Sequence, residues 1–299
     1  MTRSLSVGVG QLQPTSDRGH NLERIEQLTR QAAAAGTDLL IFPELAVTGW
    51  GSDPREIPGL AEPIDGPSVQ RLARLADETG VTVVCGLYEI GDDASGRPYN
   101  TQVAVAPDNG VIASHRKVHL YDAWGYRESD EVQPGAGELA TLTVNGIQVG
   151  LMNCYEVRFP ERAYALVDAG CDVLAVSAAW ARGPLKEEHW QLNVRARAVE
   201  NTVWIAAASL AGPDVIGRSL ISDPLGVARV QLDESAERWA AVEADPERMA
   251  HAQRALPIRK QRSQYYHSSS RAQALKPHPT HRVEPDVPAL DSVSMEGGS

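Results

Sequence analysis

The sequence predicts an α/β fold in which a mixed sheet, built in two or more layers, carries helices on its outside. Apolar segments rich in β-branched residues alternate with amphipathic segments along most of the chain, which is typical of βα architectures. Two hairpin signals, Asn109-Gly110 and Asn145-Gly146, interrupt this alternation. Because hairpins join antiparallel strands, a simple parallel Rossmann sheet is excluded.

The expected strands are short apolar runs, most of them bounded by turn residues. They span Leu5–Gln11, Asp38–Phe42, Val81–Tyr88, Tyr99–Ala106, Gly110–Arg116, Glu138–Val144, Ile147–Met152, Val173–Ala179, Thr202–Ser209, Ser219–Ser222, Ala228–Leu232 and Trp239–Val242. The amphipathic segments expected to form helices are Asp17–Ala35, Ser68–Gly80, Arg162–Ala169 and Leu185–Asn201. The segment Lys117–Gly137 is expected to be a loop.

The chain has only two phenylalanines, and both stand in the tripeptide Phe-Pro-Glu. Phe42 and Phe159 each lie where the chain passes from an expected strand toward a helix. Two related βα halves packed sheet to sheet would explain the repetition.

The composition changes near the end of the sequence. From about Ser268 it is dominated by Ser, Pro, His and Glu, which cannot build a core. We therefore expect a folded domain over residues 1–267. Residues 268–299 are expected to form a tail that is flexible or packs on a partner subunit.

Composition and charge exclude several classes of function. Hydrophobic residues make up 42% of the 299, enough for one large core or two modest ones. No apolar run is long enough to span a bilayer, and the Met1 region lacks a signal-peptide pattern. The formal net charge of −11 argues against a nucleic-acid partner, because phosphate binding needs a basic face. Neither nucleic acid nor membrane is therefore expected as a partner.

The three cysteines, Cys85, Cys154 and Cys171, are an odd number at wide and irregular spacing. They form neither a disulfide framework nor a metal-binding pair, so a cytoplasmic location is expected. Cys85 and Cys171 lie in apolar runs and are expected to be structural. No cluster of His, Cys, Asp or Glu has metal-ligand spacing, so no metal site is expected.

Cys154 stands between an expected strand and an expected helix. The strand fixes its position, while the N–H groups of the turn and the helix dipole favour a thiolate and, later, an oxyanion. This is a good place for a nucleophile. A buried small hydrophobic residue is nevertheless the commoner fate of a free cysteine, so the choice depends on acidic and basic residues elsewhere.

Glu44 is the candidate general base. It follows the apolar strand Asp38–Phe42 directly, and apolar surroundings would raise its pKa. A solvated loop carboxylate or a helix N-cap partner is the alternative. His115 and His119 are alternative bases for a Cys–His pair.

Lys117 is the candidate for oxyanion stabilisation. It alternates with apolar Val118 and Leu120 at the end of an expected strand, where it could also hold the cysteine as a thiolate. Glu128 lies in the loop that follows. It is either a surface acid or a residue that orients Lys117 or the attacking water.

Together these residues resemble the Glu, Lys and Cys motifs of the nitrilase superfamily of carbon–nitrogen hydrolases. The matching segments are Ile41-Phe42-Pro43-Glu44, His115-Arg116-Lys117-Val118-His119-Leu120 and Asn153-Cys154-Tyr155-Glu156-Val157-Arg158-Phe159-Pro160-Glu161. Further matches are Lys186–Trp190, Arg195–Val203 and Gly217–Gly226. The resemblance extends roughly from Ser4 to Tyr266, in the family's order.

The resemblance implies an α-β-β-α sandwich of two mixed sheets with outer helices, and protomers that pair into a homodimer or a larger homo-oligomer. It implies no metal or organic cofactor. Carried over by position, Cys154 is the nucleophile, Glu44 the general base and Lys117 the oxyanion stabiliser. Glu128 matches the family's second glutamate.

The implied reaction is hydrolysis of a small-molecule amide through a cysteine thioester. The backbone N–H of Tyr155 faces the oxyanion together with Lys117. Family members that act on nitriles tend to follow the cysteine with Trp-Glu-Asn, whereas this chain has Tyr-Glu-Val. A linear carboxamide is therefore favoured, with an N-carbamoyl compound as the alternative and a nitrile less favoured.

The substrate-binding residues are less defined by sequence. Trp50, Trp180 and Trp190 could form the wall of the pocket or belong to the core. Arg182 is the candidate clamp for a substrate carboxylate, with a solvated loop arginine as the alternative. Arg158 is interpreted as part of a charge-paired helix start with Glu161.

Two other functional classes remain open at this stage. A binding or regulatory protein could use the same scaffold without catalysis. A thioesterase or cysteine peptidase would instead require a Cys–His pair, formed by His115 or His119.

Overall fold

The computed structural model describes residues 4–49, 55–92, 96–235 and 237–266. The chain divides into two units between Arg259 and Lys260. Of the second unit, only residues 260–266 are described, and the tail expected from Ser268 lies outside the described residues. None of the helices in the described ranges is long and apolar enough to cross a membrane.

The first sheet has six strands in the order β14-β1-β2-β3-β4-β5. They are β1 (Leu5–Gln11), β2 (Leu39–Ile41), β3 (Thr82–Glu89), β4 (Tyr99–Ala106), β5 (Gly110–Arg116) and β14 (Arg238–Ala244). The strands β1, β2 and β3 are parallel, and the remaining neighbours pair antiparallel. The sheet is therefore mixed, as the hairpin signals predicted.

The second sheet also has six strands, in the order β13-β12-β11-β10-β9-β8. They are β8 (Thr141–Val144), β9 (Ile147–Asn153), β10 (Val173–Ala178), β11 (Trp204–Ser209), β12 (Leu220–Ser222) and β13 (Ala228–Gln231). Again three central strands are parallel, and the outer ones pair antiparallel.

The two sheets repeat one topology, in which a βαβαβ segment is followed by two antiparallel strands. In the first half this is β1 to β5 and in the second β9 to β13, so two related halves are present. The Phe-Pro-Glu tripeptides do not mark equivalent places, however. Phe42 follows the second strand of its half, whereas Phe159 follows the first.

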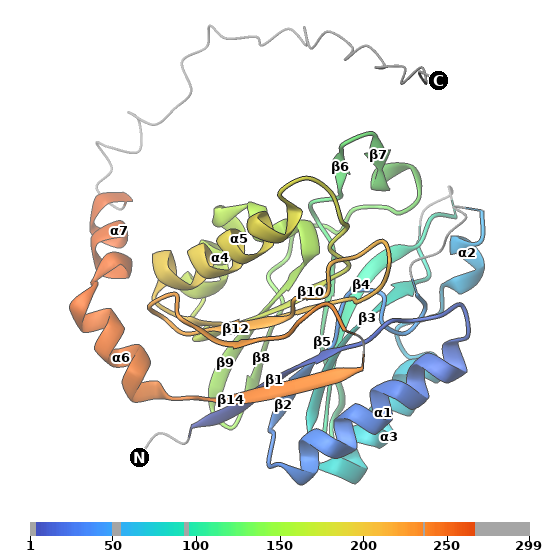
Figure 1. The fold of residues 1–299 in the computed structure, drawn as a ribbon, viewed down its shortest axis with the longest axis horizontal. Coiled ribbons are helices and arrows are strands. Elements are labelled where there is room, and N and C mark those ends of the chain that lie inside the picture. Colours follow the sequence, from blue (N-terminus) through green and yellow to red (C-terminus); the bar gives the residue numbers. More distant parts are fainter. Residues whose placement is uncertain (1–3, 50–54, 93–95, 236, 267–299) are drawn as a thin grey trace, which may run out of the picture. The chain divides into compact units, whose positions relative to one another are not determined.

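Four helices cover the outer faces of the two sheets: α1 (Arg18–Ala34), α3 (Pro67–Thr79), α4 (Pro160–Asp168) and α5 (Lys186–Asn201). Figure 1 shows α1 and α3 together along the first sheet and α4 and α5 along the second. The first pair packs on residues such as Leu40 and Val83, and the second on residues such as Leu174 and Ile205.

A third apolar core lies between the sheets. It contains Val7 and Ile41 from the first sheet and Leu151 and Ala206 from the second, all fully buried. Burial of apolar side chains on both faces of each sheet is the main force that stabilises such layers. The architecture is an α-β-β-α sandwich, which confirms the predicted fold.

The sequence did not predict several short elements. The segment expected to be a loop contains β6 (Asp122–Ala123), β7 (Tyr126–Arg127) and the 3-10 helix η1 (Glu128–Asp130). The others are α2 (Ile57–Leu60), η2 (Cys154–Arg158), α6 (Pro246–Ala255) and α7 (Ile258–Tyr266). Most of these have too few residues to show a hydrophobic period.

Candidate active site

Cys154 is the first residue of η2, directly after β9. Its backbone has φ 48°, in the left-handed region that residues other than glycine rarely adopt. Such strain persists only where the surrounding structure imposes it, and it is common at functional sites. The side chain is buried but lines a cavity.

Glu44 lies just beyond β2 and is buried beside Cys154. Its Oε1 accepts hydrogen bonds from Lys117 Nζ at 2.7 Å and from Asn100 Nδ2 at 2.7 Å. Its Oε2 accepts from the backbone N–H of Ala179 at 2.7 Å. The Cys154 thiol also interacts with this carboxylate.

The charge state of Glu44 differs from the sequence expectation. Burial acts to raise its pKa, but the Lys117 ammonium, the Cys154 thiol and the backbone N–H of Ala179 outweigh burial and hold the pKa below the ordinary value of 4.5. The prediction of a raised pKa considered only the apolar strand and was wrong. Glu44 is an ionised carboxylate.

Lys117 follows β5 and is buried between two carboxylates. Its Nζ lies 2.7 Å from Glu44 Oε1 and 2.9 Å from Glu128 Oε2. Burial acts to lower its pKa, but Glu128 and Glu44 together raise the pKa well above 10.5. The side chain is therefore a fixed positive charge.

Cys154 is protonated in this resting state. Burial and the neighbouring Glu44 carboxylate raise the pKa of its thiol well above 9.0, although Lys117 opposes them. The expectation that Lys117 and the turn hold a free thiolate was therefore wrong. The structure instead places a neutral thiol next to the Glu44 carboxylate.

Asn100, on β4, bridges the two glutamates. Its Nδ2 donates to Glu44 and, at 3.0 Å, to Glu128 Oε1, while its Oδ1 accepts from Asn153 Nδ2 at 3.0 Å. Glu128 also accepts from the backbone N–H of Tyr121 at 2.6 Å. The carboxylates of this site are thus held by donors from several elements.

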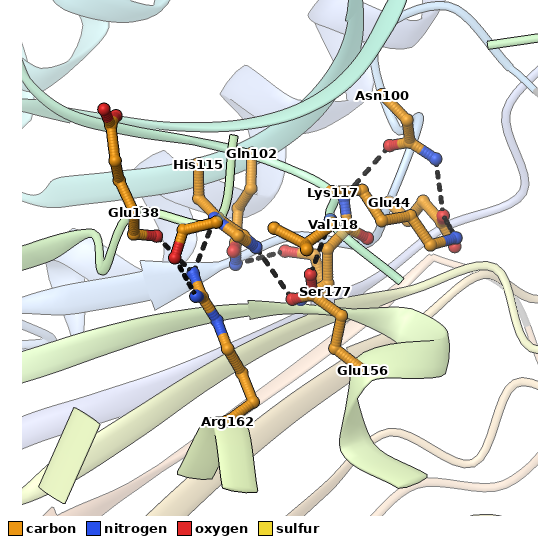
Figure 2. Close-up of polar contacts among 12 residues, drawn as sticks. Glu44, Asn100, Gln102, His115, Lys117, Val118, Glu138, Glu156, Arg162 and Ser177 are labelled. Carbon is orange, nitrogen blue, oxygen red and sulfur yellow. Dashed lines mark hydrogen bonds and ion pairs between the residues drawn. The ribbon is translucent and has the colours of Figure 1, made fainter. Parts of the chain in front are cut away.

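A second buried network fixes the ends of the two strands that carry Lys117 and Cys154 (Figure 2). Glu156 Oε1 accepts from the backbone N–H of Val118 at 2.8 Å, and its Oε2 accepts from that of Asn153 at 2.8 Å. These two residues are the direct neighbours of Lys117 and Cys154.

The histidines considered as alternative bases are not in the cavity. His115 Nε2 lies 2.7 Å from Glu156 Oε2, and Arg162 Nη2 lies 3.1 Å from its Nδ1 (Figure 2). His119 stacks on Phe159, with ring centroids 3.9 Å apart. Neither histidine lines the cavity that holds Cys154.

The cavity has a volume of about 40 Å³. Its described lining comprises Glu44, Leu45, Tyr88, Asn100, Lys117, Tyr121, Tyr126, Glu128, Cys154, Tyr155, Arg158, Ala179, Trp180, Ala181 and Lys186. The structure therefore brings together the four residues predicted to be catalytic.

The predicted substrate-binding residues are found in different places. Tyr155 and Trp180 line the cavity, whereas Arg182 lines a separate cavity next to it. Trp190 is a residue of α5 that is fully buried in the core, and its Nε1 donates to the Arg218 carbonyl. Trp50 lies outside the described residues.

Two cationic residues of the lining, Arg158 and Lys186, were not predicted there. Arg158 does not form the predicted ion pair with Glu161 among the described residues, and its guanidinium lies 4.7 Å from the Trp180 ring centroid. Lys186 is the first residue of α5. A lysine at a helix start is disfavoured by the helix dipole, which is the signal that could have identified it.

The sequence model of the family described as carbon-nitrogen hydrolase matches residues 6–254. The chain is a carbon-nitrogen hydrolase.

Similar proteins place the hydrolase in the nitrilase superfamily. It is 35% identical over 252 residues to the deaminated glutathione amidase of Escherichia coli O157:H7, covering 84% of the chain and 95% of that protein. It is 33% identical over 264 residues to the mouse omega-amidase NIT2, covering 84% and 92%. The structure of Saccharomyces cerevisiae Nit3, of branch 10 of this superfamily, matches at TM-score 0.76 and 28% identity, covering 87% of the hydrolase and 97% of Nit3.

Proposed function

We propose that the hydrolase cleaves the C–N bond of a linear carboxamide and releases a carboxylic acid and ammonia. The observation that carries the proposal is the Cys154 thiol in one cavity with the ionised Glu44, whose carboxylate is paired with the ammonium of Lys117. Similarity to a deaminated glutathione amidase and to an omega-amidase supports an amide as the substrate.

In the first half of the reaction, Glu44 takes the thiol proton as Cys154 attacks the carbonyl carbon. A base already in contact with the nucleophile lowers the cost of forming a buried thiolate. The oxyanion that develops on the carbonyl oxygen faces Lys117 Nζ and the backbone N–H of Tyr155. The protonated Glu44 then gives its proton to the departing nitrogen, which leaves a Cys154 thioester and ammonia.

In the second half, Glu44 takes a proton from water, and the resulting hydroxide attacks the thioester carbonyl. The tetrahedral intermediate collapses, the acid leaves, and the proton on Glu44 returns to the Cys154 sulfur. Each turnover thus consumes one amide and one water. We propose that Glu128 keeps Lys117 aligned throughout. Its carboxylate accepts a hydrogen bond from Lys117 and is itself held in place by hydrogen bonds from Asn100 and from the backbone of Tyr121.

A carbamoyl compound is the second candidate substrate. Arg158 supports it, because a guanidinium in the catalytic cavity could bind the carboxylate next to a carbamoylated nitrogen. A nitrile is less favoured, since Tyr155 follows the cysteine.

The test is ammonia release from the carboxamide, carbamoyl and nitrile forms of one acyl group. We expect the carboxamide to have the largest kcat/KM, and Cys154→Ala to lose at least about 1000-fold of it. Cys171→Ala is the matched control, because Cys171 is a buried thiol outside the cavity. A larger kcat/KM for the nitrile would contradict the proposal. If the carbamoyl form has the largest kcat/KM, the second candidate substrate replaces the first.

A further inference from the structure

Lys186 is a buried ammonium without a carboxylate partner in the described part of the chain. The residue is 3% exposed. Its Nζ donates to Tyr121 Oη at 2.7 Å and lies 3.9 Å from the Trp124 ring centroid. Aromatic rings stabilise a cation less than a carboxylate does, so this lysine retains the capacity to bind an anion.

The position of Lys186 is also fixed by a third aromatic residue, Trp180. Trp180 Nε1 donates to the Lys186 backbone carbonyl at 2.9 Å, and the Trp180 ring stacks on the guanidinium of Arg158. Burial and the like charge of Arg158 lower the pKa of Lys186 to about 8. No described carboxylate forms an ion pair with Arg158 either, so two cations share one end of the cavity.

The catalytic end of the cavity has the opposite character. There the two carboxylates of Glu44 and Glu128 pair with one ammonium, that of Lys117. A substrate with one anionic and one uncharged end is therefore drawn to a single orientation. Its anion goes toward Lys186 and Arg158, and its neutral carboxamide goes toward Cys154.

Lys186 also lies where the catalytic cavity meets a second cavity. A second cavity of about 490 Å³ adjoins the catalytic one of about 40 Å³. Tyr121, Tyr126, Ala181 and Lys186 line both. An acyl chain that extends from the catalytic cavity into the second one therefore lies beside Lys186.

We propose that Lys186 is a specificity-determining residue that binds a carboxylate at the far end of the substrate's acyl chain, with Arg158 beside it and the second cavity taking any remaining length. The inference rests on the proposed amidase function. It narrows the substrate class to amides that carry a distal carboxylate.

The first test compares glutaramic acid with its methyl ester, two amides that differ only in the distal charge. We expect the wild type to prefer the acid by about 10- to 100-fold in kcat/KM, the range for a charged hydrogen bond. Lys186→Met should remove most of that preference, and Lys186→Arg should keep it. Lys260→Met, at an exposed lysine, is the matched control and should match the wild type. Equal rates of acid and ester in the wild type would overturn the inference without any variant.

The second test measures binding without turnover. Calorimetry should detect glutarate binding to the Cys154→Ala protein, and the added change Lys186→Met should weaken it about 10- to 100-fold. If the wild type cleaves no amide but glutarate binds in this way, the proposed function fails and the anion site stands. Absent binding, or equal binding by both proteins, overturns the anion site.

Discussion

At the scale of single residues, the thiol of Cys154 is protonated and the carboxylate of Glu44 is ionised. This arrangement follows from the neighbours of each group: the carboxylate receives hydrogen bonds from Lys117, Asn100 and the Ala179 backbone, whereas the thiol of Cys154 has an anion beside it. In the proposed mechanism, attack by Cys154 then needs only a proton transfer from the thiol to Glu44.

The pKa of Glu44 predicts the acid limb of the pH profile. Since kcat/KM reports the free enzyme, and Glu44 must be ionised to act, activity should decline only below pH 4.5, its ordinary value. The measurement is kcat/KM for an uncharged amide against pH, with residual structure followed by circular dichroism. An acid limb centred near 6.5, the pKa of an ordinary histidine, would support a Cys–His pair instead.

Glu156 gives a second prediction at this scale. Burial acts to raise its pKa, but His115 and the two backbone N–H groups lower it to about 2. A folded-state pKa below the unfolded value of 4.5 stabilises the protein by about 3 kcal/mol above pH 4.5, and this contribution is lost as pH falls toward 2.

We therefore expect Glu156→Gln to lower the free energy of unfolding by about 3 kcal/mol at pH 7. It should lower kcat as well, because glutamine keeps only one acceptor oxygen, and one of the two backbone N–H groups, of Val118 or Asn153, loses its partner. Urea unfolding and steady-state kinetics measure the two effects. Glu161→Gln, at an exposed acid of the same motif, is the control. An unchanged kcat would show that Glu156 only stabilises the fold.

At the scale of elements, the site is built where strand ends from both sheets meet. β2 and β5 from the first sheet place Glu44 and Lys117, and β9 from the second places Cys154. Close approach of the backbones is needed here. A Cβ added to Gly86 of β3 would lie 2.5 Å from Leu45 N and 2.7 Å from Glu44 Cα.

Gly86→Ala should therefore displace the turn that carries Glu44. We expect a loss of about 10- to 100-fold in kcat, from misplacement of the base by a fraction of an ångström. Gly59→Ala is the control, because a Cβ there meets nothing within 4 Å. Matching kcat for the two variants would mean that the turn tolerates the extra methyl group.

The sequence could predict that Glu44, Lys117 and Cys154 belong to one site, because each follows the end of a recognisable strand. Short motifs around Glu44, Lys117 and Cys154 were sufficient for that. Sequence could not give the ionisation states, since these depend on donors such as the Ala179 N–H that come from remote strands. Lys186 was missed as a pocket residue for the same reason: Tyr121 and Trp124, which contact its ammonium, come from a distant segment of the chain.

At the scale of the whole molecule, the fold was predictable because alternating patterns and two hairpin signals fix a mixed sheet, and the family resemblance supplied the sandwich. What periodicity could not show was strand order. β14 joins the first sheet beside β1, more than 200 residues earlier in the chain. Pairing at that separation is decided by packing of the whole domain and leaves no local signal.

We also propose that the protein forms a homodimer or a larger closed assembly, as the family resemblance implies. Sedimentation velocity at micromolar concentration should show no monomer as the main species. A fully active, monodisperse monomer would contradict this proposal.

The central claim is that Cys154 carries the acyl group between two half-reactions. The most direct measurement is mass spectrometry of the intact enzyme, quenched in acid within milliseconds of mixing with a carboxamide, followed by peptide mapping. We predict a mass increase equal to the acyl group less one hydrogen, located on the peptide that contains Cys154. An adduct on Cys85 or Cys171, or turnover with no adduct on any cysteine, would contradict the account.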